Sequence, residues 1–407
     1  MSGGTRSFEF ARRLAAAGHE VNVITADVDR TRERESGPEH IDGIHVHWLP
    51  VAYSNQMSYL LRIVAFFKFA FLAAKQARRV GGDVVFATST PLTIAIPGVI
   101  ASRALKIPMV FEVRDLWPEM PIAIGALRNP VTKFMARTLE RFAYRNSEHI
   151  IALSPGMADG VAGAGYPREQ ISVIPNGCDI DLLQFDANAR DRFLQEHPYL
   201  TTAPLVVYGG TLGRINGVGY LVDIAFASRG LGLGVNFLIV GNGYERQAIE
   251  DKARQLGVLG ENIWIIPPVS KIDMAAVLSA ADLATSLVID LPELWKNSAN
   301  KFFDALASGT PIAINHQGWQ AGLLEKSGAG IVLPAVNAQE AARQIAELVC
   351  DEVKLASAAN AAKQLAVDLF DRERLAAEFI NILQDAASGT AIRGVARTFD
   401  DIGEEPH

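Results

Sequence analysis

The chain has 407 residues, of which 49% are hydrophobic, enough to form the cores of two or three domains. Its formal net charge of -7 gives no reason to expect a nucleic-acid partner, because nucleic-acid-binding domains usually carry a basic face. Cys178 and Cys350 are too few for a disulfide framework or a structural zinc site, and a reduced cytoplasmic compartment is expected.

The first half of the chain alternates strand and helix patterns, as in a doubly wound parallel sheet. A helix at residues 5–17 follows Gly3 and Gly4 at the start of this pattern. The predicted strands then lie at residues 20–25, 44–48, 83–86, 108–113, 149–153 and 171–174. These elements predict an N-terminal Rossmann-like domain at residues 1–187. A glycine turn before a helix normally follows a buried strand, but only Met1 and Ser2 precede Gly3. This domain is therefore expected to lack its first strand, either because the strand is missing at this start site or because the domain does without it.

Two segments of the first half resemble membrane spans in their apolar content. In residues 84–102, two prolines and a glycine divide the segment into a strand, a turn and a short helix, as expected for a buried βα unit. The second segment, residues 59–79, is a helix with five basic side chains, Arg62, Lys68, Lys75, Arg78 and Arg79. Such a helix either lies on an anionic membrane surface or packs with its cationic ends reaching water.

The second half of the chain repeats the alternation after an irregular, polar stretch at residues 185–204. The predicted strands are residues 205–208, 235–240, 262–266, 283–287, 311–314 and 330–333. Helices follow at residues 338–355, 358–365 and 372–386. We therefore expect a second Rossmann-like domain at residues 188–369. Residues 387–407 lack periodicity and end in acids, which predicts a disordered tail.

The segment NSANKFFDALASGTP, residues 297–311, is the most informative part of the chain. Asn300 and Lys301 begin an apolar helix that carries one acid, Asp304, and ends at Gly309, a residue typical of left-handed helix caps. An ammonium and amides at a helix N-terminus attract phosphates, and a carboxylate one turn later accepts hydrogen bonds from hydroxyls. A ligand with both groups, such as a nucleotide sugar, suits this pattern.

Seven segments in order resemble one enzyme family: GGTRSFEFARRLAAAGHEVNVIT, FEVRDLWPE, VIPNGCD, YGGTLGRINGVGYLV, FLIVGNGYER, ADLATSLV and SANKFFDALASGTPIAI. They are similar to the retaining glycosyltransferases of family 4, most of all to the L-fucosamine transferase branch of bacterial polysaccharide biosynthesis. The resemblance extends from Gly3 to about Phe379. It implies the α/β GT-B fold, in which two Rossmann-like domains face each other across a cleft. The second domain would hold the donor, the first the acceptor, and a C-terminal helix at about 370–386 would cross back to the first.

The resemblance also assigns roles at the donor site. As the sugar is transferred, charge builds on the departing pyrophosphate, so cations and backbone N–H groups should converge there. Arg214 and Lys301 are candidate catalytic cations, which removes the need for a metal, and no cofactor is expected. Asp304 matches the second acid of the family's two-carboxylate motif, which binds the ribose. The expected nucleotide-binding residues are Gly3, Gly4, Gly210, Thr211, Arg214, Asn216, Gly241, Asn300, Lys301 and Asp304.

The chain departs from the family pattern at several positions. Lys296 stands where relatives carry the first acid, which implies an unusual contact to the donor sugar through Lys296, Asn297 and Ser298. Thr211 and Asn216 replace the family's Arg and Lys clamp, and Arg114 stands at the position of a family His. Arg114 and Asp115 follow an apolar strand, so they are either catalytic or an ion pair that orders the loop.

The predicted function is transfer of a sugar, an N-acetylated deoxyhexose, from a UDP-sugar to a lipid-linked saccharide in bacterial surface polysaccharide biosynthesis, as for O-antigen or capsule. The enzyme would be peripheral at the inner face of the cell membrane. Two alternatives remain open: a UDP-sugar epimerase of the same architecture, and a catalytically inactive sugar-nucleotide binding protein. The oligomeric state stays undetermined.

Overall fold

The computed structural model describes residues 6–27, 37–53, 57, 59–89, 91–392, 394, 395 and 399. These residues divide into two compact units. Unit 1 contains residues 175–372 and 399, and unit 2 contains residues 6–174 and 373–395 with the gaps above. The division falls at Pro175, whereas the sequence places the boundary after residue 187. The reason is packing, because Cys178 and Leu183 are fully buried in a core of unit 1.

Unit 1 is built on a six-stranded parallel sheet with the strand order β10-β9-β8-β11-β12-β13. Its strands are β8 (Leu205–Gly209), β9 (Asn236–Val240), β10 (Ile263–Ile266), β11 (Leu283–Ser286), β12 (Ile312–Ile314) and β13 (Gly330–Val332). All six match predicted strands. From β8, the next strands along the chain, β9 and β10, lie toward one edge of the sheet, whereas from β11 the next strands, β12 and β13, lie toward the other edge. The carboxyl ends of these two strands therefore form the switch point at which open α/β sheets bind ligands.

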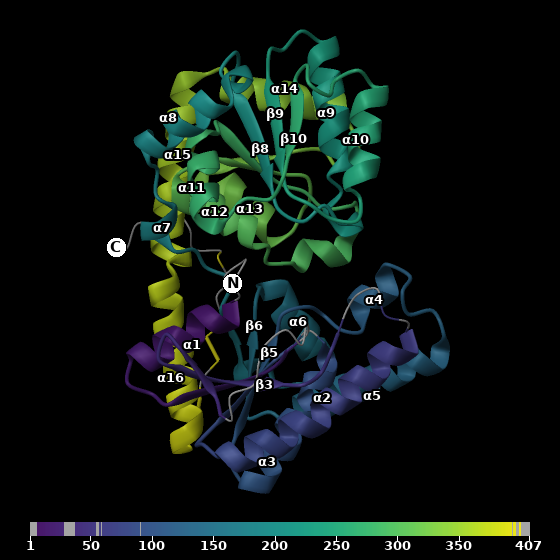
Figure 1. Cartoon of the computed structure of the whole chain (residues 1–407), viewed down its shortest axis with the longest axis vertical. Helices are drawn as coiled ribbons and strands as arrows, with labels where there is room; N and C mark the ends of the chain where they lie inside the picture. The colour runs from purple at the N-terminus through teal and green to yellow at the C-terminus, as the bar shows by residue number, and fades with distance from the viewer. Residues whose placement is uncertain are drawn as a thin grey trace. The chain divides into compact units, whose positions relative to one another are not determined.

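Helices cover both faces of the unit 1 sheet (Figure 1). One layer packs through α9 (Gly219–Gly230), α10 (Arg246–Gln255) and α14 (Ala338–Val349). The other layer and its flanks contain α7 (Ile180–Leu183), α8 (Ala187–Glu196), α11 (Lys271–Ala280), α12 (Asn300–Ser308), α13 (Trp319–Ser327) and α15 (Glu352–Leu365). Short turns of helix complete the unit at η3 (Pro198–Leu200), η4 (Arg214–Asn216), η5 (Pro292–Lys296) and η6 (Ala366–Phe370).

The helix predicted at residues 338–355 is in fact two helices. The first ends at Val349, and Asp351 begins the second by accepting hydrogen bonds at its carboxylate from the backbone N–H groups of Val353 and Lys354. An Asp at this position satisfies donors that would otherwise lack an intrahelical partner. The cap separates α14 from α15, so the break comes earlier than the sequence pattern indicates.

Unit 2 contains two separate sheets instead of one. The smaller sheet has the order β1-β3-β2. In it, β1 (Val21–Ala26) and β3 (Ile44–Leu49) are parallel, and β2 (Glu39–Ile41) pairs antiparallel with β3. The sequence did not predict β2. The larger sheet is parallel, with the order β4-β5-β6-β7, for β4 (Val85–Thr88), β5 (Met109–Val113), β6 (His149–Ala152) and β7 (Ile171–Val173). Both β1 and β4 are edge strands among the described residues, as the prediction of a missing first strand requires.

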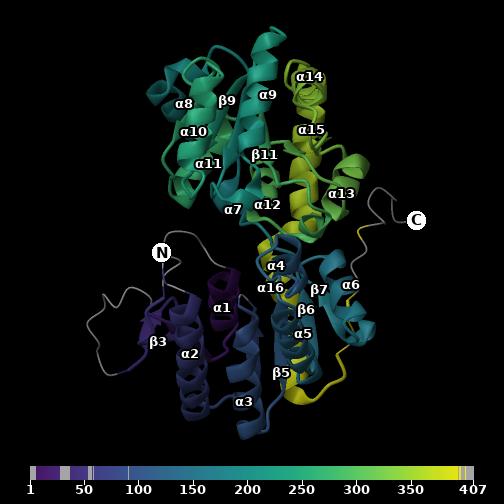
Figure 2. The ribbon, with the colours of Figure 1, turned by 90° about the vertical axis from the view of Figure 1, so that its right-hand side faces the viewer.

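The helices of unit 2 pack on both faces of these sheets. The bounds are α1 (Arg6–Ala16), α2 (Tyr59–Val80), η1 (Leu92–Ile94), α3 (Ala95–Leu105), α4 (Glu119–Ala123), α5 (Pro130–Arg145), α6 (Pro155–Gly163), η2 (Arg168–Gln170) and α16 (Arg372–Ser388). Helix α3 lies between α2 and α5 (Figure 2). Phe10 of α1 stacks on Phe379 of α16, with 4.8 Å between ring centroids. Within the described residues, every helix is too short or too polar to cross a bilayer.

The tail predicted to be disordered is ordered over part of its length. Helix α16 continues to Ser388. Beyond it, the Val395 carbonyl accepts from the backbone N–H of Val173 in β7, and the Gly394 N–H donates to the Glu169 carbonyl. Phe399 stacks on Trp319 at 5.2 Å between ring centroids. A short segment that pairs with an edge strand leaves no periodic signal in the sequence. The last seven residues, 401–407, lie outside the described part of the chain.

Candidate functional site

The loops after β8 and β9 approach each other closely at the switch point of unit 1. A Cβ atom at Gly241 would lie 2.0 Å from the carbonyl oxygen of Gly210, so any residue larger than glycine would force these loops apart. The Gly210 N–H donates to the Val240 carbonyl at 3.0 Å, which ties the end of β8 to β9. The two predicted glycine positions thus lie together, and both follow strands that end at the switch point.

Lys301 in the first turn of α12 reaches the same place. Its ammonium donates to the Tyr208 hydroxyl at 2.9 Å and to Asn216 Oδ1 at 3.3 Å, and it lies 4.4 Å from the centre of the Tyr208 ring. The Thr211 carbonyl accepts from both the Tyr208 hydroxyl, at 2.8 Å, and Asn216 Nδ2, at 2.9 Å. These contacts hold the ammonium beside Gly210, whose hypothetical Cβ would lie 3.7 Å from Lys301 Nζ.

Burial lowers the pKa of Lys301 to about 7. The polar atoms around the ammonium are neutral, so they compensate only part of the hydration that it has lost. An anion placed beside it would favour the charged form and raise its pKa again. Ala299, the N-cap residue of α12, supplies no capping side chain, so the first N–H groups of the helix also suit an anion.

Two of the remaining predicted nucleotide-binding residues belong to elements that also carry Lys301 or its partners. Arg214 is an exposed residue of η4, in the same loop as Thr211 and Asn216. Asn300, the first residue of α12, is exposed. Gly3 and Gly4 lie outside the described residues. Tyr208 was not predicted as a site residue. Its position at the end of an apolar strand resembles that of an ordinary core tyrosine, and only the contact with Lys301 distinguishes it.

Asp304 lies one turn further along α12 and is partly buried. Burial raises its pKa to about 6, while the positive charges of Lys271 and Arg372 oppose the shift. Both cations pair with Asp179: Lys271 Nζ lies 2.5 Å and Arg372 Nη1 3.2 Å from Asp179 Oδ2. These three residues come from segments far apart in the chain, so sequence spacing gave no signal that they surround Asp304. At neutral pH the carboxylate is charged and can accept hydrogen bonds.

The candidate donor-sugar residues Lys296, Asn297 and Ser298 precede α12. Ser298 is buried, and its Oγ accepts from the Asn176 N–H at 3.1 Å while its carbonyl accepts from Asn176 Nδ2 at 2.6 Å. The Asn297 carbonyl accepts from the Trp319 indole at 3.1 Å. The structure therefore shows Ser298 holding the loop in place, and it leaves Lys296 and Asn297 partly buried beside it.

Arg114 and Asp115 belong to unit 2, at the carboxyl end of β5. Both are partly buried, and the Arg114 N–H donates to Ser89 Oγ at 2.9 Å. Arg214 and Lys301 belong to unit 1. The sequence gave no sign that another acid of unit 2, Glu140 of α5, has a shifted pKa. Its pKa is raised to about 7, first by burial and then by the charge of Glu119.

The basic helix predicted at residues 59–79 is α2. Its exposed cations, Lys68, Lys75, Arg78 and Arg79, are referred to below as the α2 cations; Arg62 is partly buried. Large apolar side chains are exposed on the same helix: Leu61 at 57%, Val64 at 62%, Phe67 at 64% and Phe71 at 71%. Steps of three or four residues along a helix share a face, so Leu61, Val64, Lys68, Phe71, Lys75 and Arg78 form one stripe.

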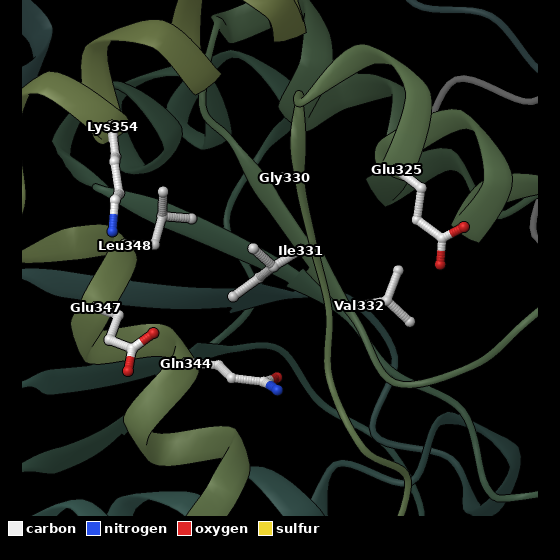
Figure 3. Close-up of a pocket in the computed structure, with 8 residues that line it drawn as sticks. All are labelled: Glu325, Gly330, Ile331, Val332, Gln344, Glu347, Leu348 and Lys354. Atoms are coloured by element: carbon white, nitrogen blue, oxygen red, sulfur yellow. The ribbon is translucent and has the colours of Figure 1, made fainter.

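A cavity of about 440 Å³ in unit 1 lies along the edge strand β13 (Figure 3). Gly330, Ile331 and Val332 of this strand line it together with Glu347 and Lys354, which come from α14 and the start of α15. None of the predicted site residues lines this cavity. This cavity is therefore separate from the candidate site at the carboxyl ends of β8 and β11.

Two Rossmann-like units with parallel sheets define the GT-B fold of glycosyltransferases. Solved structures share it: the Anabaena protein Alr3699/HepE, solved in complex with UDP-glucose, superposes with a TM-score of 0.67 at 21% identity, over 84% of this chain and 87% of that one.

Residues 3–177 match the family of glycosyl transferase 4-like domains, and residues 203–351 match glycosyl transferases group 1. The chain therefore belongs to the glycosyltransferases, with one domain of each of these two kinds.

Curated relatives are glycosyltransferases as well. An alpha-D-kanosaminyltransferase of Streptomyces kanamyceticus is 24% identical over 268 residues, 65% of this chain and 67% of the relative. The putative colanic acid biosynthesis glycosyl transferase WcaI of Escherichia coli K12 is 24% identical over 294 residues, 69% of this chain and 71% of the relative.

Proposed function

We propose that this chain transfers a sugar from a UDP-sugar to a lipid-linked saccharide, with retention of configuration at the anomeric carbon and without a metal. The observation that carries the proposal is the position of Lys301. Its ammonium is held at the switch point of unit 1, beside two glycine turns and at the N-terminus of α12. The structure of Alr3699/HepE with UDP-glucose supports a uridine nucleotide as the donor.

Lys301 would contribute to the transfer by binding the diphosphate. As the bond to the sugar breaks, negative charge grows on the diphosphate oxygens, and a fixed ammonium stabilises that charge more than it stabilises the bound donor. Arg214 is exposed on the same loop system and would supply a second positive charge, and Asp304 would accept hydrogen bonds from the ribose. Two side-chain cations and the helix N-terminus would then do the work of a metal.

The donor sugar would lie near Lys296 and Asn297. A lysine in place of the family's acid implies a different donor sugar or a different contact to it, and the resemblance of the sequence suggests an N-acetylated deoxyhexose. Arg114 and Asp115 of unit 2 are proposed to act at the sugar or the acceptor. WcaI, a relative named for colanic acid biosynthesis, supports a role in bacterial polysaccharide assembly.

Unit 2 would bring the enzyme to an anionic membrane surface, where a lipid-linked acceptor lies. Helix α2 supports this part of the proposal, because its exposed stripe combines large apolar side chains with the α2 cations. Helix α5 has a similar exposed set, with Val131, Phe134 and Met135 in its first half and Arg141 and Arg145 in its second.

The deciding experiment incubates the purified protein with a panel of UDP-sugars and a lipid-linked saccharide extract, with and without EDTA. Product formation that survives EDTA, and an anomeric NMR signal of the same configuration as in the donor, support a retaining, metal-independent transferase. Conversion of a UDP-sugar without acceptor would instead indicate an epimerase. A thermal shift with UDP but no turnover would indicate an inactive binding protein.

A further inference from the structure

Strand β13 forms an open edge of the sheet in unit 1. Within the described residues this strand is the last of the order β10-β9-β8-β11-β12-β13, and it pairs with β12 alone. All three residues of β12 are buried, whereas all three of β13 are only partly buried. The cavity of about 440 Å³ runs along this edge, so α13, α14 and α15 flank the strand but leave it accessible (Figure 3). An accessible edge is a template for pairing with another strand.

Two residues of β13 direct their backbone groups toward the cavity. The carbonyl of Ala329 accepts a hydrogen bond from β12 at 3.2 Å, and the N–H of Leu333 donates to β12 at 2.7 Å. Because successive residues of a strand direct their backbone groups to opposite edges, Ile331 also faces β12. The N–H and C=O groups of Gly330 and Val332 therefore point away from β12, into the cavity.

The side chains along this edge carry opposite charges toward its two ends. Figure 3 shows Lys354 beside the Gly330 end of the strand, and Glu347 further toward the Val332 end. Both of these charged side chains are exposed. Lys354 Nζ lies 3.8 Å from Asp351 Oδ2, and the lysine side chain remains 64% exposed, so this contact occupies little of the ammonium.

The edge is complementary to itself in a second copy turned about a twofold axis. When two identical strands pair antiparallel with the axis at Ile331, Gly330 of one copy lies opposite Val332 of the other. Both of these residues direct their backbone groups outward, so each opposing pair can exchange N–H···O bonds in both directions. The same rotation brings the Lys354 end of each copy to the Glu347 end of the other.

Exposed apolar side chains lie near both ends of the same edge. Val336, in the loop between β13 and α14, is 82% exposed, and Val353, which precedes Lys354 in α15, is 81% exposed. In the twofold pairing the loop of Val336 comes to the end of the edge at which Val353 of the other copy lies. Apolar surface that is left in water by a single copy would then be buried.

We propose that this chain forms a homodimer in which the β13 strands of two copies pair antiparallel about Ile331, so that the sheets of the two unit 1 domains become continuous. Lys354 of each copy then faces Glu347 of the other and can also reach Gln344, whose Oε1 accepts no hydrogen bond within the described residues. None of the predicted site residues lines this edge, so dimer formation and the proposed sugar transfer are independent.

The first test measures the mass of the full chain by sedimentation velocity between about 1 and about 200 µM, a range suited to a small interface. The unmodified chain should change from monomer to dimer over this range. Val332→Pro removes an outward N–H but no hydrogen bond to β12, so the fold should be kept. The dissociation constant of the dimer should rise by about tenfold or more. The melting temperature checks that this variant is folded.

Glu347→Lys and Lys354→Glu form a second test at exposed positions, which decides the question if Val332→Pro unfolds the chain. In either variant like charges face each other across the axis, and the dimer should be weaker by about fivefold or more. Mixing the two variants should restore association as a heterodimer, because opposite charges then face each other at both ends of the paired strands.

A chain that stays monomeric up to about 200 µM would overturn the proposal. A dimer that keeps its affinity in folded Val332→Pro, or in either charge variant, would also overturn it, because the contact would then lie on another surface. The same conclusion follows if the two charge variants fail to associate when mixed, since their individual losses would not come from a contact between Lys354 and Glu347.

Discussion

The pKa of Lys301 predicts how donor binding depends on pH. In the empty protein the ammonium is half-deprotonated near pH 7, because burial removes its hydration. A diphosphate needs the charged form, so the donor must bring a proton with it above this pH. The affinity for a UDP-sugar should therefore fall as the pH rises through 7, in contrast to the behaviour of an exposed lysine, which stays charged until about pH 10.

The magnitude follows from the strength of a hydrogen bond to a charged group, about 1.5–3 kcal/mol. Losing it corresponds to a roughly 10- to 100-fold increase in Kd, which should develop between about pH 6.5 and about pH 9. UDP-glucose is the suitable probe, because its diphosphate does not titrate in this range. Isothermal titration calorimetry in buffers of different ionisation enthalpy would also count the proton taken up on binding.

The matched control is Lys301→Arg, because arginine remains charged throughout this range. Its Kd for UDP-glucose should vary by less than about threefold over the same pH range, whatever its absolute value. A flat profile for the unmodified protein would refute the reasoning, as would a Lys301→Arg variant that keeps the steep profile. The first result would mean that Lys301 does not contact the diphosphate. The second would assign the titration to another group.

Three further predictions concern other parts of the molecule. Asp304→Ala should raise the Kd for UDP, measured by calorimetry, about tenfold or more. The control Asp273→Ala, which replaces an exposed acid of α11, should leave this Kd unchanged. An increase of less than twofold for Asp304→Ala would remove Asp304 from the nucleotide pocket. The pKa of Glu140 is about 7 in the folded state, against 4.5 in the unfolded chain. The folded state therefore binds the proton more tightly, and the free energy of unfolding should fall by up to about 3 kcal/mol as the pH rises from 4.5 to 7. Glu140→Gln should abolish that fall in urea titrations, and an unchanged pH dependence would contradict the assignment. Replacing the α2 cations by glutamine should release the protein from phosphatidylserine vesicles in flotation assays. Replacing four exposed basic residues of unit 1 by glutamine should leave vesicle binding unchanged. Equal binding of the two variants would contradict a membrane role for α2.

The strand pattern could be predicted from the sequence, and the candidate donor segment could be singled out, because both depend on local chemistry. Apolar runs bounded by glycine and proline predicted every strand of unit 1, and Gly309 ends α12 in the left-handed conformation, with φ of 71°. Lys301 and Asp304 could be singled out because an apolar helix rarely carries such groups without a partner or a ligand. The family resemblance then pointed to glycosyltransferase domains, which the comparisons confirm.

Other features were decided only by tertiary contacts between distant segments. Tyr208 and Asn216 position the Lys301 ammonium, and burial there lowers its pKa, yet these residues lie about 90 positions from it in the chain. The same holds for Asp179, Lys271 and Arg372 around Asp304. Burial and charge depend on which segments the fold brings together, and spacing along a chain contains no record of that. The sequence also gave no sign that the strands of unit 2 divide into two sheets, with β1 and β4 as edge strands among the described residues and one cavity of about 510 Å³ lined by both.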